Sequence, residues 1–141
     1  MQRRMRAEAW RHVLSLATPA AALLAAIVAT SAQSAFPFDR ELLLDARPLP
    51  GSKRVPILEI GADGRAQIDL WCRSGAGQAV VAGMAIKFTL GAMREDSCTS
   101  ERAQRDEEMA SMLSQVTRWR MENDVVVLIG PTELRFHLSS H

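Results

Sequence analysis

One stretch with the periodicity of an α-helix, residues 99–122, separates two groups of short strand-like segments. This stretch contains no glycine or proline. Its apolar side chains recur at steps of three and four residues: Met109, Met112, Leu113, Val116 and Trp119. The stripe predicts a single amphipathic helix, capped at its start by Ser97 or Thr99 and ended by Asn123. Because one apolar stripe must be buried against something, we expect the helix to cover one face of a sheet.

Strand-like segments flank this helix, four before it and two after it. They are 54–60, 66–72, 78–82, 84–90, 125–129 and 133–138. Turn chemistry separates them, with an Asp-Gly pair, the segment SGAGQ (74–78), a lone glycine and a Gly-Pro-Thr turn. The chain therefore predicts an α+β domain: a small antiparallel curled sheet of about six or more strands with one amphipathic helix packed on it.

Residues 33–53 show no clear strand period and contain three prolines and a glycine. We interpret them as an N-terminal arm that packs Phe36, Phe38 and the cluster Leu42–Leu44 before a proline-rich turn. The folded domain is expected to occupy 54–141.

The first 32 residues have the segment order of a secretory signal peptide. Four arginines give a basic start, an apolar run follows over 13–28, and small residues cluster in ATSAQSA (29–35). We expect cleavage between Ala32 and Ala35. A retained membrane anchor is the alternative, but the apolar run is barely long enough to span a bilayer and contains Pro19.

Removal of this leader changes the charge of the chain. The leader holds four of the 17 basic residues and one of the 16 acidic residues, so 13 basic and 15 acidic residues remain. A nearly neutral domain offers no basic surface for DNA or RNA. No later apolar run is long enough to cross a membrane. We therefore expect a periplasmic or secreted monomer whose partner is an envelope protein or a small ligand.

Both cysteines, Cys72 and Cys98, follow the leader, one at the end of a predicted strand and one just before the predicted helix. Because disulfides form in exported proteins, we predict a Cys72–Cys98 disulfide that stabilises the fold by about 3–4 kcal/mol. Two free thiols are one alternative. A redox-active pair is another, since a helix N-terminus can activate a thiol, but the two cysteines do not form a C-x-x-C motif.

No residue pattern points to catalysis, a cofactor or a metal. His137 and His141 are the histidines that remain after the leader, and they lack the further ligands of a zinc site. Met109 and Met112 could bind copper(I), but they also fit the apolar stripe of the helix. The carboxylates of Asp106–Glu108 diverge around the helix axis and fit its solvated face. We therefore predict no catalytic residue, no cofactor and no metal, and a protein that is not an enzyme.

Trp71 is the side chain that we single out as a possible partner contact. On the strand alternation it faces away from the side that holds Ile68. An exposed tryptophan there could bind a partner or a carbohydrate. Alternatively, the N-terminal arm buries Trp71 together with Phe36 and Phe38.

The order of these elements resembles the META domain family of envelope proteins. The motifs that carry the resemblance are LWCRSGAGQ (70–78), LGAMREDSC (90–98), the helix segment 101–119 and the closing strands VVVLIGPTELRF (125–136). Together they cover about residues 55–136. In this sequence Trp71 and Arg73 flank the first cysteine, where the family commonly has Gly and Asn.

The resemblance implies an α+β fold, a location in the cell envelope, no established enzymatic activity and a role in stress tolerance. An alternative is an inhibitor or accessory subunit of an envelope enzyme, acting through the predicted loop RSGAG (73–77). A metal-dependent or hydrolytic enzyme is the third class.

Overall fold

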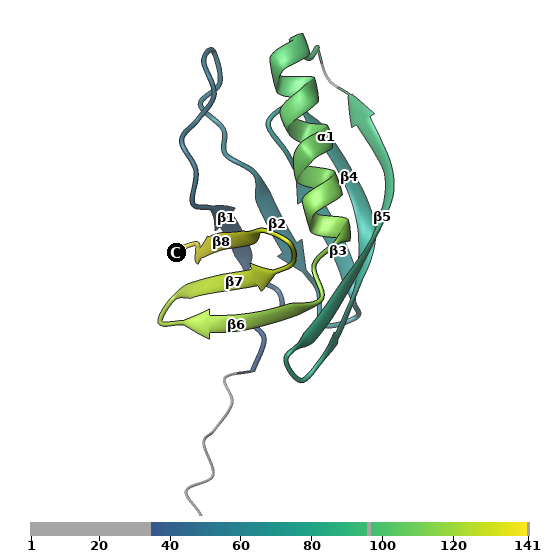
Figure 1. Ribbon diagram of the computed structural model, residues 1–141, viewed down its shortest axis with the longest axis vertical. Helices are drawn as coiled ribbons and strands as arrows, with labels where there is room; N and C mark the ends of the chain where they lie inside the picture. The colour runs from purple at the N-terminus through teal and green to yellow at the C-terminus, as the bar shows by residue number, and fades with distance from the viewer. Residues whose placement is uncertain (1–34, 96, 141) are drawn as a thin grey trace, which may run out of the picture. The chain divides into compact units, whose positions relative to one another are not determined.

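The computed structural model describes residues 35–95 and 97–140 (Figure 1). The predicted signal peptide and His141 lie outside these residues. The elements follow in the order β1 (Glu41–Leu44), β2 (Ile57–Ile60), β3 (Arg65–Asp69), β4 (Arg73–Ala82), β5 (Ala85–Glu95), α1 (Ser100–Ser114), β6 (Arg118–Glu122), β7 (Val125–Ile129) and β8 (Glu133–Leu138).

The strands form a closed antiparallel barrel in which every strand pairs with its neighbours in the chain. β1 and β8 close the barrel, with Leu42 opposite Leu138. The pairing of β5 with β6 is limited to Ala85 and Arg118. α1 belongs to the connection between these two strands and packs against β5 (Figure 1). The predicted α+β class is confirmed, but the sheet has eight strands in the described residues.

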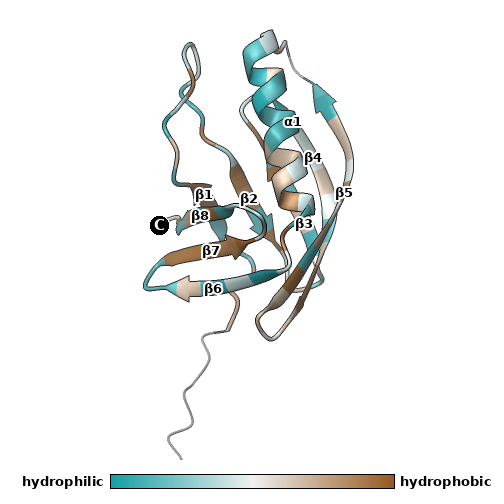
Figure 2. Cartoon of the chain, viewed as in Figure 1, coloured by the Kyte–Doolittle hydropathy of each residue, from teal (hydrophilic) through white to brown (hydrophobic). Residues whose placement is uncertain are grey.

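The core lies inside the barrel and beneath α1. Side chains with almost no exposure come from most of the elements: Leu42, Leu58, Ile60, Ile68, Ile86, Leu113, Val126, Leu128 and Phe136. Figure 2 shows β7 hydrophobic along its length, whereas α1 is hydrophilic at its N-terminal end and more apolar toward its C-terminal end. The alternation predicted for β8 is confirmed, since Leu134 and Phe136 are both buried.

The helix is shorter than the sequence predicts. Thr99, one of the two expected candidates, is its N-cap and accepts a hydrogen bond from the backbone N–H of Arg102. α1 then ends at Ser114, and the segment Arg118–Glu122 forms β6 instead of two further helical turns. Within the described residues, no helix has both the length and the apolar character needed to cross a membrane.

Trp119 explains why periodicity gave the wrong end for the helix. It is buried, as the helical stripe requires, but it reaches the core from β6, opposite Leu128 of β7. A short apolar segment that enters a strand can keep a helical spacing by coincidence. Asn123, expected to end the helix, has a φ of 57° and lies in the turn between β6 and β7.

Two segments predicted as irregular are strands. Within the expected arm, residues 41–44 form β1, with Leu42 and Leu44 buried. The segment 73–78, expected to be a loop and turn, lies inside β4, and the chain turns earlier, over residues 70–72. Glycine makes this possible, because a Cβ at Gly77 would lie only 2.6 Å from the Thr89 carbonyl oxygen of β5.

Candidate functional site

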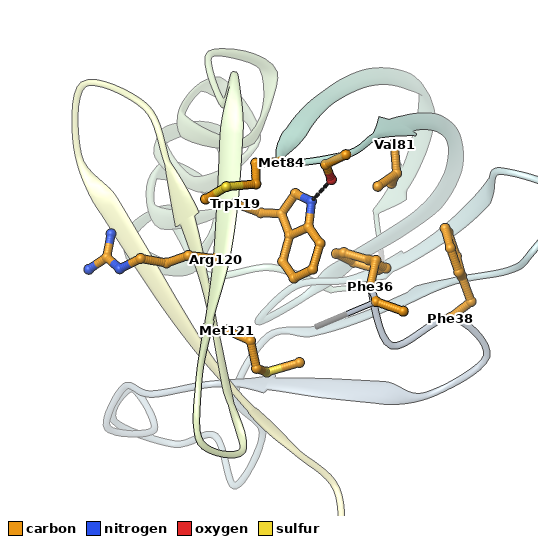
Figure 3. A pocket seen from close by; sticks show the side chains of 9 residues that line it. Phe36, Phe38, Val81, Met84, Trp119, Arg120 and Met121 are labelled. Carbon is orange, nitrogen blue, oxygen red and sulfur yellow. Dashed lines mark hydrogen bonds between the residues drawn. The ribbon is translucent and has the colours of Figure 1, made fainter. Parts of the chain in front are cut away.

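An apolar pocket of about 480 Å³ lies between the N-terminal segment, the tip of the β4–β5 hairpin and β6 (Figure 3). Each of these three segments supplies three lining residues: Ala35, Phe36 and Phe38; Val81, Gly83 and Met84; Trp119, Arg120 and Met121. Pockets of this size with mainly apolar and aromatic linings are typical of sites for small ligands. The sequence did not reveal this pocket, because its three walls are far apart in the chain.

Aromatic side chains form one wall of the pocket. The ring of Phe36 lies 4.9 Å from that of Trp119 in an edge-to-face arrangement and 5.0 Å from that of Phe38. The Trp119 indole N–H donates a 2.8 Å hydrogen bond to the Gly83 carbonyl oxygen, drawn in Figure 3. This bond ties β6 to the hairpin tip and fixes the orientation of the indole.

Arg120 is the charged residue among those that line the pocket. Its guanidinium binds Glu133 at 2.9 Å and Glu122 at 2.7 Å, and Figure 3 shows it directed away from the aromatic rings. Hydrogen bonds from Arg120 hold the pKa of both glutamates below the ordinary value, and the two carboxylates raise the pKa of Arg120. Because this charge is paired outside the pocket, the lining is mainly apolar.

A buried carboxylate holds α1 to the turn between β3 and β4. Asp106 is 0% exposed and accepts hydrogen bonds from three consecutive backbone N–H groups, those of Trp71 at 2.9 Å, Cys72 at 3.0 Å and Arg73 at 2.7 Å. The interpretation of Asp106 as part of the solvated helix face is therefore wrong. The position of Asp106 in the sequence could have indicated its burial, because it lies three residues before Met109, on the buried face of the helix.

The predicted disulfide between Cys72 and Cys98 is present, with the two Cα atoms 5.6 Å apart. It lies beside the Asp106 carboxylate. The two sulfur atoms and a carboxylate oxygen of Asp106, all atoms that could bind a metal ion, lie within 4.8 Å of one another. Such a cluster could resemble a metal site, but here the sulfur atoms are bonded to each other and the carboxylate already accepts three N–H groups. The cluster is therefore a structural lock at the start of α1.

Trp71 is buried, with 8% of its surface exposed. Together with Gly51–Arg54 and Arg102 it lines a second hollow, so the proline-rich turn faces it, whereas Phe36 and Phe38 line the pocket at Trp119. Its indole N–H has no hydrogen-bond partner among the described residues. A contact between Trp71 and a partner stays a prediction.

The other predicted candidates lie apart from the pocket. Met109 is in the core and Met112 is half-buried, as the helix stripe predicts. His137 is exposed on β8 and lies 3.4 Å from Asp45.

The fold and the disulfide define a class of protein: a small antiparallel barrel, stabilised by a disulfide, with one helix inserted before β6. Residues 40–140 match the META domain, and the chain belongs to this family. The match begins before β1, so the family domain includes a strand that the sequence assigned to the arm.

No curated protein matches the chain. Among solved structures, one protein determined by NMR is similar over 70% of this chain and 88% of its own, with a TM-score of 0.56 and 13% identity. A DUF4847 family protein from Bacteroides vulgatus has a TM-score of 0.49 and 14% identity, over 58% of this chain and 57% of that one. At these identities the first likeness shows the fold alone.

Proposed function

We propose that this META domain is an exported, non-enzymatic binding protein of the bacterial cell envelope that acts in stress tolerance. The apolar pocket of about 480 Å³ carries the proposal of binding. Among the described residues its lining offers no free charge, because the guanidinium of Arg120 is paired with two glutamates. Such a lining suits an apolar group of a ligand or partner and offers no acid–base pair for catalysis.

The walls of the pocket combine rigid and adaptable side chains. Trp119 is held by its hydrogen bond to Gly83 and by the ring of Phe36. Met84 and Met121 contribute flexible thioether side chains, which can follow ligands of different shapes. This combination favours binding of a class of apolar groups over recognition of one polar molecule.

Export is supported by the disulfide. The Cys72–Cys98 bond fastens the start of α1 to the β3–β4 turn, and such bonds persist in oxidising compartments. The family and the basic, apolar and small segments at the N-terminus point the same way.

A neutral fluorescent probe, N-phenyl-1-naphthylamine, tests the pocket directly. Protein purified from the periplasm should bind it saturably, with an increase in probe fluorescence. Met121→Glu places a charge in the pocket and should weaken binding by about tenfold or more. Met112→Glu is the matched control, because Met112 is also half-buried but lies outside the pocket. Equal binding by the two variants, or no saturable binding by the unchanged protein, would overturn the proposal.

A further inference from the structure

The tip of the β4–β5 hairpin is apolar and exposed. Val80 is 68% exposed and Met84 is 37% exposed, and these are the large hydrophobic side chains that protrude from the described residues. The segment Val80–Ala85, VVAGMA, has no polar side chain. Hairpin tips normally carry Gly, Asn, Asp or Ser. An apolar tip of this kind indicates a surface that something covers.

Two cations stand beside this tip. Lys87 lies opposite Val80 on the neighbouring strand, and Arg118 lies opposite Ala85. Both are exposed, and neither forms an ion pair within the part of the chain that the structure describes. The patch therefore combines apolar side chains with unpaired positive charge.

The linings of the hollows on the two sides of the hairpin are alike in their lack of acidic residues among the described residues. Val81, Gly83 and Met84 belong to the pocket described above. Val80 and Lys87 belong to a further hollow of about 410 Å³, separate from the one that Trp71 lines. Neither lining includes a carboxylate among the described residues. The tip thus lacks the acidic groups that an anionic surface would repel.

We propose that the β4–β5 hairpin tip docks the domain on an anionic lipid bilayer. Val80 and Met84 enter the interfacial region of the bilayer, while Lys87 and Arg118 lie at the level of the headgroups. Figure 1 shows this tip projecting beyond the neighbouring strands, as insertion requires. A lipid surface fits these observations, because protruding apolar side chains lie beside unpaired positive charges, and neither adjoining hollow is lined by a carboxylate among the described residues.

Docking of the hairpin tip would also fix where the pocket lies relative to the bilayer. Because Gly83 and Met84 belong both to the tip and to the pocket lining, the docked tip brings the pocket close to the bilayer surface. The inference goes beyond the proposed binding function and does not depend on it.

Vesicle flotation of the disulfide-bonded protein tests the docking. We expect the protein to float with vesicles of equal parts phosphatidylglycerol and phosphatidylcholine at low salt. It should float poorly with phosphatidylcholine alone, or when the salt is raised to about 0.5 M. Lys87→Glu combined with Arg118→Glu should weaken binding by more than about tenfold. Val80→Asp combined with Met84→Asp should abolish it.

The control variant combines Ala46→Asp with Ala92→Asp, two exposed positions outside the hairpin tip, and should float as the unchanged protein does. Met121→Glu should also float, which separates docking from binding in the pocket. The proposal is wrong if Val80→Asp with Met84→Asp floats normally, or if flotation is equal on neutral vesicles. A dimer that forms without lipid and is lost in Val80→Asp with Met84→Asp, in a protein that does not float, would assign the tip to a second copy of the chain instead.

Discussion

Asp106 shows how much of this fold depends on a single side chain. Its carboxylate accepts the backbone N–H groups of Trp71, Cys72 and Arg73, which the tight turn after β3 leaves without strand partners. A buried N–H group without an acceptor lowers the free energy of unfolding. The Asp106 carboxylate of α1 therefore stabilises the turn by accepting these three groups. Glu107, the next residue, is exposed, and its partner among the described residues is the side chain of Arg73.

Asp106→Asn should destabilise the protein by about 3 kcal/mol, because an amide oxygen accepts fewer and weaker bonds than a carboxylate and its NH₂ group opposes the backbone donors. Urea denaturation at neutral pH measures the loss. Glu107→Gln, at the adjacent exposed position, should change stability by no more than about 0.5 kcal/mol. Similar urea midpoints for both variants would show that the three bonds do not hold the turn.

At the scale of elements, the outer face of β6, β7 and β8 is held by a chain of ion pairs. Arg120 binds Glu122 and Glu133, and Arg135 binds Glu122 at 2.8 Å. Val127, fully buried on the central strand, lies opposite Arg120 on one side and opposite Arg135 on the other. The aliphatic parts of the two arginines therefore cover an apolar residue while their charges remain paired.

This network predicts a loss of stability in acid. The pKa values of Glu122 and Glu133 lie below the ordinary value of 4.5 in the folded protein. A depressed pKa stabilises the folded state above the unfolded pKa, and this contribution is lost as the pH falls through the lower folded pKa. Thermal unfolding from pH 6 down to about pH 3 should therefore be less steeply pH-dependent in Glu133→Gln than in the unchanged protein.

Glu101→Gln is the control for the acid experiment, because Glu101 is exposed and forms no ion pair among the described residues. It should keep the pH dependence of the unchanged protein. At pH 7 the effect of Glu133→Gln should be small, since exposed ion pairs contribute at most about 1 kcal/mol. Identical pH dependence in all three proteins would rule out a role for the network.

At the scale of the whole molecule, the proposed export would account for the disulfide between Cys72 and Cys98. Such bonds form and persist in oxidising environments, and the proposed docking of the β4–β5 hairpin tip would place the pocket beside a bilayer. The barrel itself closes through β1 and β8, elements from opposite ends of the domain.

Expression of the full chain in a bacterium should yield a periplasmic product that begins between Gln33 and Phe36. Mass spectrometry of the fractionated protein checks the cleavage position. Thiol labelling of the unfolded product should modify neither cysteine before reduction and both cysteines after it. A cytoplasmic product that keeps residues 1–32, or two reactive thiols before reduction, would contradict export of a disulfide-bonded domain.

Local patterns predicted much of the fold and little of the site. A short apolar run located β7, alternation located β8, and Thr99 was one of two candidates for the helix cap, because these features depend on residues near in sequence. The pocket could not be predicted from the sequence. Its three walls were interpreted as unrelated elements: the N-terminal segment as an arm, the β4–β5 hairpin tip as a turn, and β6 as the end of the helix. Asp106 was misassigned because the spacing of charges says nothing about the backbone donors that the fold brings to them.

The sequence by itself determined the α+β class, several of the antiparallel strands, the amphipathic helix and the disulfide between the two cysteines. Each follows from periodicity, turn residues or composition over short stretches of chain. The tertiary structure alone decided that the sheet closes, that α1 stops before β6, and that Asp106 is buried. The reason is physical: the bond from Trp71 to Asp106 joins residues 35 positions apart, and that from Trp119 to Gly83 joins residues 36 apart. Such contacts exist only once the barrel has brought these segments together.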